Sequence, residues 1–302
     1  MDFCLKRYLH ALTAFCLLCL GATTSASAAV IDVVASFTVL GDVVKNVGGD
    51  HVRVRSLVPP DGDPHEFEPS PDDVKALKAA SVVFVSGKGL ETWFERLAKA
   101  AGGTKPVVVS DGIKEHTMRE DGKTIIDPHV WNSVPNVMTW VDNIERALEK
   151  ADPKDVSDFK HTAERYRATL RDLDQYVRAR IGDIPASKRK ILTSHDAFSY
   201  MGREYGLKFL APQSVSTEME ASAADVATLI DQIKSEGLTA YFVENSTDTA
   251  LVKQVANATH AQPGGMLYPE ALSPAGGPIR SYVGMIRYNT DQMAMATLSR
   301  AK

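Results

Sequence analysis

One long amphipathic segment, residues 152–182, constrains the fold of this chain more than any other feature. Asp152 and Pro153 suit the start of a helix, and Gly182 and Pro185 suit its end. Roughly 30 residues at about 1.5 Å each make a rod of roughly 45 Å, which is longer than one small lobe. We therefore expect a single helix that runs along two lobes. Its apolar face is spaced at three and four residues: Val156, Phe159, Ala163, Tyr166, Leu170, Leu173, Val177 and Ile181.

Short β-rich runs alternate with helical stretches on both sides of that segment. The expected strands are 31–35, 52–58, 82–85, 107–109, 190–193, 207–210, 239–243 and 266–268. The expected helices are 39–47, 71–79, 90–100, 134–148, 197–204, 222–235, 248–258 and 278–298. Such alternation predicts parallel sheets covered by helices. The predicted fold class is therefore α/β, with two parallel-sheet lobes (30–151 and 186–302) joined by one long rigid helix (152–185).

Residues 1–29 have the layout of a secretory signal peptide. Lys6 and Arg7 precede an apolar run of about 13 residues, and small residues lead to a cleavage site after Ala28 or Ala29. A transmembrane anchor is the alternative, but the run is shorter than the ~20 residues that span a bilayer. We therefore expect an exported, periplasmic protein with no stable membrane insertion.

All three cysteines, Cys4, Cys16 and Cys19, lie within that peptide. Its removal leaves about 273 residues with no cysteine for a disulfide, a zinc–cysteine site or a nucleophile. Neither Cys16 nor Cys19 follows the small residues of a lipoprotein cleavage site, so no lipid anchor is expected. The peptide carries a net +1, so its removal takes the formal charge from −4 to about −5. A mildly acidic surface argues against nucleic acid as a partner.

Four segments place possible metal ligands beside turn residues. The candidates are His65, His129, His195 and Glu270, within residues 61–67, 127–131, 193–196 and 268–271. The first, third and fourth segments follow predicted strands, and open parallel sheets bind ligands beyond the carboxyl ends of their strands. Two candidates precede the long helix and two follow it. A cleft between the lobes would bring all four together.

Each of these residues has an ordinary alternative role. A single loop histidine is more often a surface or structural group, and the separations are too long for a local motif such as H-E-x-x-H. The other histidines, His51, His161 and His260, fit turns or a helix surface. His116, in the polar stretch 112–123, is a candidate accessory ligand.

Enzyme motifs fit the sequence less well. Ser194, His195 and Asp196 are adjacent, and adjacent residues cannot align a nucleophile, a base and an orienting acid. The run 87–89 has two glycines but lacks the third of a dinucleotide fingerprint. The acidic run 61–73 lacks the spacing of a calcium loop.

In their local sequences and in their order along the chain, the candidate segments resemble the metal-specific solute-binding proteins of ABC transporters, a family with zinc- and manganese-binding members. The resemblance covers nearly the whole chain after the signal peptide. The matching stretches are PHEFEPSPDDV from Pro64, GLETW from Gly89, DPHVW from Asp127, HDAF from His195 and FVE from Phe242.

This resemblance implies one metal ion in the cleft between two α/β lobes, delivered by a monomer to an inner-membrane permease and its ATPase. His65, His129 and His195 match the first three ligands of the family, whose manganese-selective members usually have a carboxylate at the third position. The fourth ligand is commonly an aspartate, and here that position is Glu270. The longer side chain is a departure from the family pattern.

Three imidazoles and one carboxylate form a four-coordinate set that suits Zn²⁺, with Mn²⁺ or Fe²⁺ as alternatives. A saturated site leaves no position for substrate, so carriage is expected and catalysis is not; a metallohydrolase and a scaffold protein are the competing hypotheses. Ligating imidazoles usually donate their second N–H to a neighbouring oxygen. Asp127, Asp196 and Glu244 are the candidates for that role.

Overall fold

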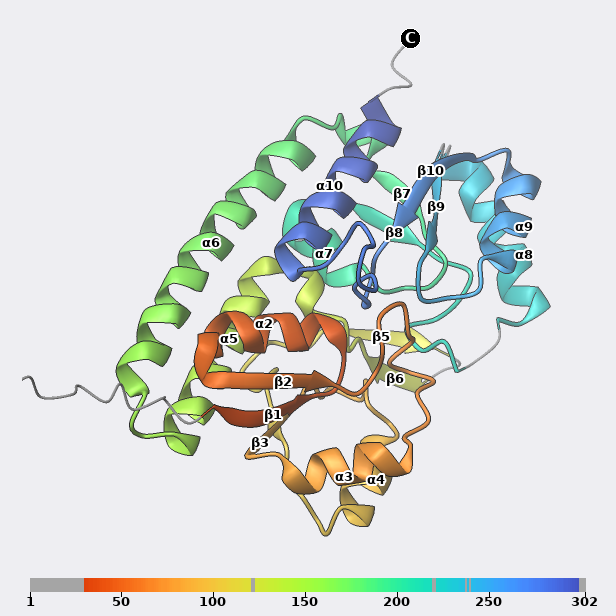
Figure 1. Cartoon of the computed structure of the whole chain (residues 1–302). Coiled ribbons are helices and arrows are strands. Elements are labelled where there is room, and N and C mark those ends of the chain that lie inside the picture. The colour runs from red at the N-terminus through yellow and green to blue at the C-terminus, as the bar shows by residue number, and fades with distance from the viewer. Residues whose placement is uncertain (1–29, 121–122, 219–220, 237, 239, 299–302) are drawn as a thin grey trace, which may run out of the picture.

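The computed structural model describes residues 30–120, 123–218, 221–236, 238 and 240–298. The predicted signal peptide and its cleavage site lie outside these residues. Two α/β lobes share one long helix along their side (Figure 1). Among the described helices, none is long and apolar enough to cross a membrane.

The N-terminal lobe is built on a parallel sheet in the order β2-β1-β3-β4. Its central strands are mostly apolar, as expected of strands that helices cover on both faces of the sheet. In Figure 1, α2 and α5 cover one face, and α3 and α4 lie on the other. The elements are β1 (Ile31–Ala35), α2 (Thr38–Gly48), η1 (Gly49–His51), β2 (Val52–Ser56), α3 (Pro71–Ala79), β3 (Val82–Val85), α4 (Phe94–Ala100), β4 (Val107–Val108) and α5 (Val134–Ala151).

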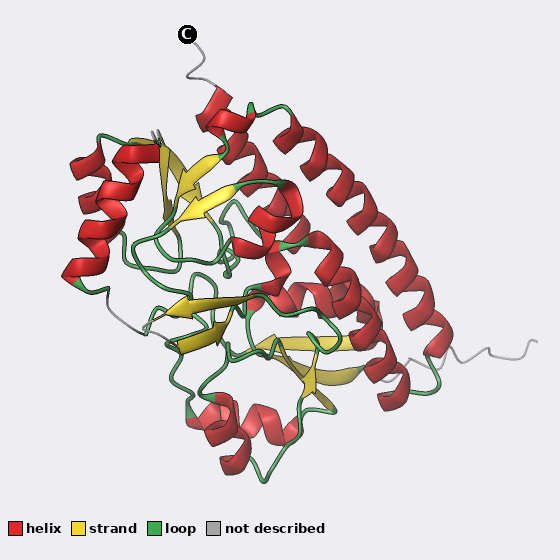
Figure 2. Ribbon diagram, turned by 180° about the vertical axis from the view of Figure 1, so that it is seen from behind, coloured by secondary structure: helices red, strands yellow, loops and turns green. Residues whose placement is uncertain are grey.

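The C-terminal lobe has a second parallel sheet, in the order β10-β9-β7-β8. A small separate core lies beneath α8 and α9. Helices α7 and α10 lie on the side of the lobe that faces the long helix (Figures 1 and 2). The elements are η3 (Ala186–Lys188), β7 (Lys190–Leu192), α7 (Ser199–Tyr205), β8 (Lys208–Leu210), α8 (Ala223–Glu236), β9 (Ala240–Glu244), α9 (Ala250–Thr259), β10 (Gln262–Leu267) and α10 (Tyr282–Leu298).

The long helix α6 (Val156–Gly182) packs on α2 and α5 of the first lobe and on α7 and α10 of the second. Its 27 residues span about 40 Å. Seven of the eight predicted apolar positions, Phe159 to Ile181, are buried. The main hydrophobic core runs without a break from the N-terminal sheet through this helix to α10. The predicted class, two parallel-sheet α/β lobes with one connecting helix, is confirmed.

One sequence expectation about local structure was wrong, and one hairpin was not predicted. Asp152 does not cap α6: helix α5 continues to Ala151, and Asp152 lies at its C-terminal end, with its N–H donating to Leu148 O. Pro153 separates the two helices, and Asp155 takes the N-cap position of α6. The polar stretch 112–123 was not expected to contain strands. It forms part of an antiparallel hairpin, β5 (Thr117–Glu120) and β6 (Lys123–Ile126).

Candidate metal centre

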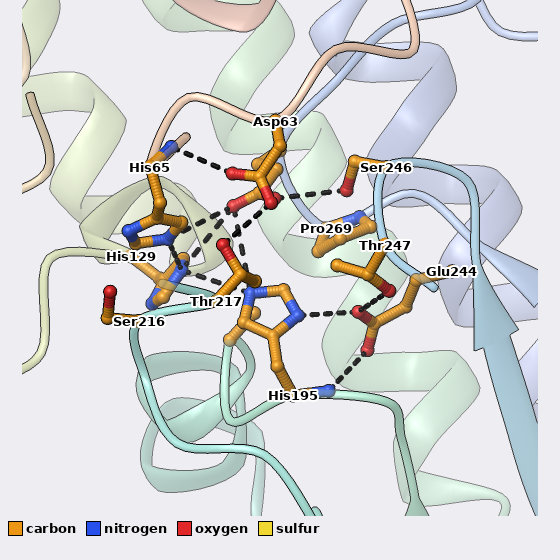
Figure 3. A network of polar contacts seen from close by, with 12 residues as sticks. Asp63, His65, His129, His195, Ser216, Thr217, Glu244, Ser246, Thr247 and Pro269 are labelled. Atoms are coloured by element: carbon orange, nitrogen blue, oxygen red, sulfur yellow. Dashed lines mark hydrogen bonds and ion pairs between the residues drawn. The ribbon is translucent and has the colours of Figure 1, made fainter. Parts of the chain in front are cut away.

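The four candidate ligands come together between the lobes. His65 lies in the loop after β2, His129 directly before the short helix η2 (Val130–Asn132), His195 after β7 and Glu270 after β10. One nitrogen or oxygen atom of each lies within 4.8 Å of the others. All four side chains are at most 3% exposed. Figure 3 shows the three imidazoles pointing toward a common centre.

Five of the six distances between these atoms are close to the edges of a small tetrahedron. His129 Nε2 lies 3.1 Å from His65 Nε2 and 3.3 Å from His195 Nε2. Glu270 Oε2 lies 3.5, 3.5 and 3.7 Å from the Nε2 atoms of His65, His129 and His195. Zinc lies about 2.0–2.2 Å from such ligands, and a regular tetrahedron of that radius has edges of roughly 3.3–3.6 Å. The donor set therefore fits one four-coordinate ion.

Buried carboxylates orient two of the imidazoles. Nδ1 of His129 lies 2.8 Å from Asp127 Oδ1, and Nδ1 of His195 lies 2.5 Å from Glu244 Oε2. An ionised carboxylate only accepts hydrogen bonds, so this network assigns the proton to Nδ1 in each ring. Each neutral ring then directs the lone pair of Nε2 inward. Two such nitrogen atoms 3.3 Å apart repel each other unless a proton or a metal ion lies between them, and a metal ion can bind both.

The two oxygens of Glu270 have different partners. Ser246 Oγ donates to Oε1 at 3.0 Å, whereas Oε2 has no hydrogen-bond partner among the described residues and faces the imidazoles. Burial alone would raise the pKa of Glu270, but the three neighbouring imidazoles, His195 above all, hold that pKa well below its usual range. Glu270 is therefore an anionic donor.

The loop that carries Glu270 is attached to the opposite lobe. Trp131 Nε1 donates to Pro269 O at 2.7 Å, and Asn132 Nδ2 donates to the same oxygen at 3.3 Å. Both donors belong to η2, which directly follows His129. The second and fourth candidate ligands are thus fixed relative to each other by hydrogen bonds between the lobes.

The carboxylates raise the proton affinity of the imidazoles. Burial lowers the pKa of His195, but Glu244 and Glu270 more than offset this and raise it well above its ordinary value. Burial also lowers the pKa of His129, and Asp127 and Glu270 raise it above its ordinary value overall. Protons and metal ions therefore compete for the same nitrogen atoms.

Two of the predicted residues do not lie where expected. Asp196 accepts no hydrogen bond from a candidate imidazole among the described contacts; its Oδ1 accepts from Ser199 Oγ at 2.7 Å, at the start of α7. The carboxylate of Asp196 thus accepts a hydrogen bond from the first turn of α7 and not from an imidazole. His116 lies outside the four-residue group, with Nδ1 3.8 Å from Asp127 Oδ2.

Sequence reasoning missed Asp63, although a signal for it was present. The tripeptide Asp-Pro-His occurs at 63–65 and again at 127–129. In both copies the aspartate Oδ1 accepts the N–H of the histidine, at 2.7 Å for His65 and 2.9 Å for His129. Asp63 Oδ2 also accepts from Thr217 Oγ1 of the other lobe at 2.7 Å (Figure 3). No sequence pattern pointed to Ser246 or Thr247.

A second group of possible ligands lies away from this centre. His51 Nδ1 is 2.7 Å from Asp155 Oδ2, and His51 Nε2 is 3.1 Å from Asp158 Oδ2. The group is more exposed than the first, and it joins η1 to the start of α6. Because both ring nitrogens face carboxylates, His51 links the first lobe to the start of the long helix.

The sequence from residue 33 to 296 matches the family described as zinc-uptake complex component A, periplasmic. The chain belongs to this family. The resemblance to metal-specific solute-binding proteins of ABC transporters is thereby confirmed.

The names of the relatives of this protein include three different metals. The manganese-binding lipoprotein MntA of Bacillus subtilis is 35% identical over 274 residues, 88% of this chain and 89% of the relative. The iron-binding protein YfeA of Yersinia pestis is 32% identical over 263 residues, 87% of this chain and 85% of the relative. The solved periplasmic zinc-binding protein TroA of Treponema pallidum superposes with a TM-score of 0.82 at 31% identity, covering 89% of this chain and 99% of TroA.

Proposed function

We propose that this protein binds one Zn²⁺ ion through His65, His129, His195 and Glu270 and delivers it to an ABC importer. As a member of its family, the protein is a divalent-metal-binding component of an ABC transporter and acts outside the cytoplasm. The observation that supports the ligand set is the convergence of three Nε2 atoms and one carboxylate oxygen within 4.8 Å of one another, with five of the six pairs at 3.1–3.7 Å. The metal arrives and leaves as cargo.

The donor set favours zinc over Mn²⁺ or Fe²⁺. The names of the relatives include zinc, manganese and iron, so the names do not decide the metal. Zinc accepts four-coordinate sites rich in imidazole without a geometric penalty, whereas manganese favours more oxygen ligands. A third imidazole from His195, where a carboxylate would suit manganese, supports zinc. Mn²⁺ and Fe²⁺ are the alternatives.

The remaining parts of the proposal concern place and partners. The signal peptide is removed after Ala28 or Ala29, and the mature protein works in the periplasm as a monomer. Its partners are the inner-membrane permease and the ATPase of the importer. Residues 30–151 and 186–302 form the lobes, and 152–185 connect them. Since four protein donors leave no position for a substrate, the protein carries metal and catalyses no reaction.

Calorimetric titration with ZnCl₂ tests this function. We expect one site per chain with a nanomolar dissociation constant, on the order of −12 kcal/mol. His65→Ala and His195→Ala should each lose most of that affinity while the circular dichroism spectrum is retained. His161→Ala, on the outer face of α6, is the matched control and should bind like the original protein. Millimolar zinc affinity, or full affinity in both site variants, would contradict the proposal.

A further inference from the structure

The two carboxylate oxygens of Glu270 lie in different environments. Oε2 makes the contacts with the three imidazoles and lacks a hydrogen-bond partner among the described residues. Oε1 accepts the hydroxyl of Ser246 at 3.0 Å. A carboxylate can bind a metal through one oxygen or through both, and this hydrogen bond engages the second oxygen.

We propose that Ser246 is a positioning residue that keeps Glu270 bound through one oxygen and so favours four-coordinate zinc over manganese. This inference rests on the proposed function of the four-residue site. With one oxygen from Glu270 the set is three nitrogens and one oxygen, which zinc accepts as a tetrahedron. With both oxygens the site becomes five-coordinate and richer in oxygen, which brings it closer to the preference of manganese.

The backbone around Ser246 is fixed on both sides. Asn245 N donates to Leu267 O at 3.2 Å, and its side-chain Nδ2 donates to Asp61 Oδ1 at 2.7 Å. Thr247 Oγ1 donates to Glu244 Oε2 at 3.2 Å. Because hydrogen bonds hold both neighbours of Ser246, the backbone that carries its hydroxyl is held in place beside Glu270. Rotation of the Glu270 carboxylate toward a metal would therefore break the hydrogen bond.

This segment, 244–247, acts on two ligands in different ways. Glu244 and Thr247 lie on the His195 side and set the direction of an imidazole. Ser246 lies on the Glu270 side and sets the number of oxygens that the carboxylate offers. Loss of the contacts to His195 should lower the affinity for every metal. Loss of the contact to Glu270 should change the ratio of the affinities for different metals.

The test compares Zn²⁺ and Mn²⁺ dissociation constants, measured by competition with a chelator of known affinity, in three variants. In Ser246→Ala we expect the ratio of zinc to manganese affinity to fall about tenfold or more, in the range that contacts to metal ligands usually affect. Ser246→Thr keeps the hydroxyl and should restore the ratio. Thr247→Ala is the matched control. It should lower the affinity for both metals with little change in the ratio of the two affinities.

The visible spectrum of the Co²⁺-loaded protein supplies a second measurement that reports coordination directly. The original protein and Ser246→Thr should show the intense bands of four-coordinate cobalt, and Ser246→Ala should show the weaker bands of five-coordinate cobalt. If Ser246→Ala keeps both the ratio and the spectrum while zinc still binds tightly, the positioning role of Ser246 is refuted and the zinc site stands. If the original protein binds none of these ions, the proposed function itself fails and this inference fails with it.

Discussion

His195 Nδ1 lies 2.5 Å from Glu244 Oε2, and both side chains are buried at the meeting point of the two lobes. The other oxygen of Glu244 accepts the backbone N–H groups of Ser194 and His195, at 2.9 and 3.3 Å. One carboxylate therefore fixes the tautomer, the ring direction and the backbone of a proposed ligand. Zinc affinity should depend on this residue even though it is not among the four proposed ligands.

Glu244→Gln should weaken zinc binding by about 10- to 100-fold. The amide cannot accept with both of its polar atoms, so either the ring or the backbone N–H groups lose an acceptor. Calorimetric titration with ZnCl₂ measures the change. Glu236→Gln is the matched control, because Glu236 pairs with Lys208 at the surface of the same lobe. Equal losses in the two variants would contradict a specific role for Glu244.

Zinc affinity should fall steadily as the pH is lowered. A metal ion needs the neutral imidazole, and the raised pKa values of His129 and His195 mean that protons begin to compete above the ordinary imidazole value. Below those pKa values the dissociation constant should rise about tenfold per pH unit for each proton displaced. Titrations from about pH 8 to pH 5 measure it. A dissociation constant that is flat over this range would show that neither imidazole binds the ion.

The long helix was predictable because its apolar residues recur at helical spacing within one continuous segment. Phe159, Leu170 and Ile181 repeat at helical spacing, and the structure buries them on one face. The start of the helix was not predictable from Asp152, because nothing local shows that α5 continues to Ala151. The hairpin Thr117–Ile126 was missed because its strands have no apolar alternation, although Asp121-Gly122 is a dipeptide typical of two-residue hairpin turns.

The four proposed ligands could be selected from the sequence because they lie in turn-rich segments, most of which follow strands. The carboxylates that accept hydrogen bonds from these imidazoles could be predicted only in part. Asp127 and Glu244 lie against imidazoles, whereas Asp196 lies against Ser199. The direction in which an aspartate side chain points depends on tertiary packing. The same limit applies to Ser246, whose partner is 24 residues away.

Asp42→Asn should stabilise the fold at neutral pH. Burial raises the pKa of Asp42 to about 6, although hydrogen bonds from Tyr282 N and Asn46 oppose the shift. Since the folded pKa exceeds the unfolded value, the charged form costs stability above about pH 6, and this cost disappears as the pH falls below about 4. We expect a gain of about 1–2 kcal/mol near pH 7.5.

Urea unfolding near pH 7.5 and near pH 4 measures this difference for Asp42→Asn. The neutral side chain keeps an oxygen that can accept from Tyr282 N, so the gain at the higher pH should vanish at the lower one. Asp50→Asn is the matched control, because Asp50 is fully exposed and its substitution removes no buried charge. A variant that is less stable than the original protein near pH 7.5 would contradict a cost of burying the charge of Asp42.

Metal release should leave the angle between the lobes nearly unchanged. Helix α6 packs on both lobes, and the main core continues through it, so a large rotation would break buried contacts. Crystal structures with and without zinc should differ by only a few degrees between lobes, with the larger shifts in the loops that carry His65 and Glu270. A rotation of tens of degrees would contradict this account.

The position of bound zinc is the most direct test of the proposed centre. An anomalous difference map at the zinc absorption edge, from crystals grown with one equivalent of ZnCl₂, should show one strong peak between the lobes. We expect that peak about 2.0–2.2 Å from Nε2 of His65, His129 and His195 and from Oε2 of Glu270. A peak at His51, Asp155 and Asp158 instead, or no peak between the lobes, would contradict the assignment.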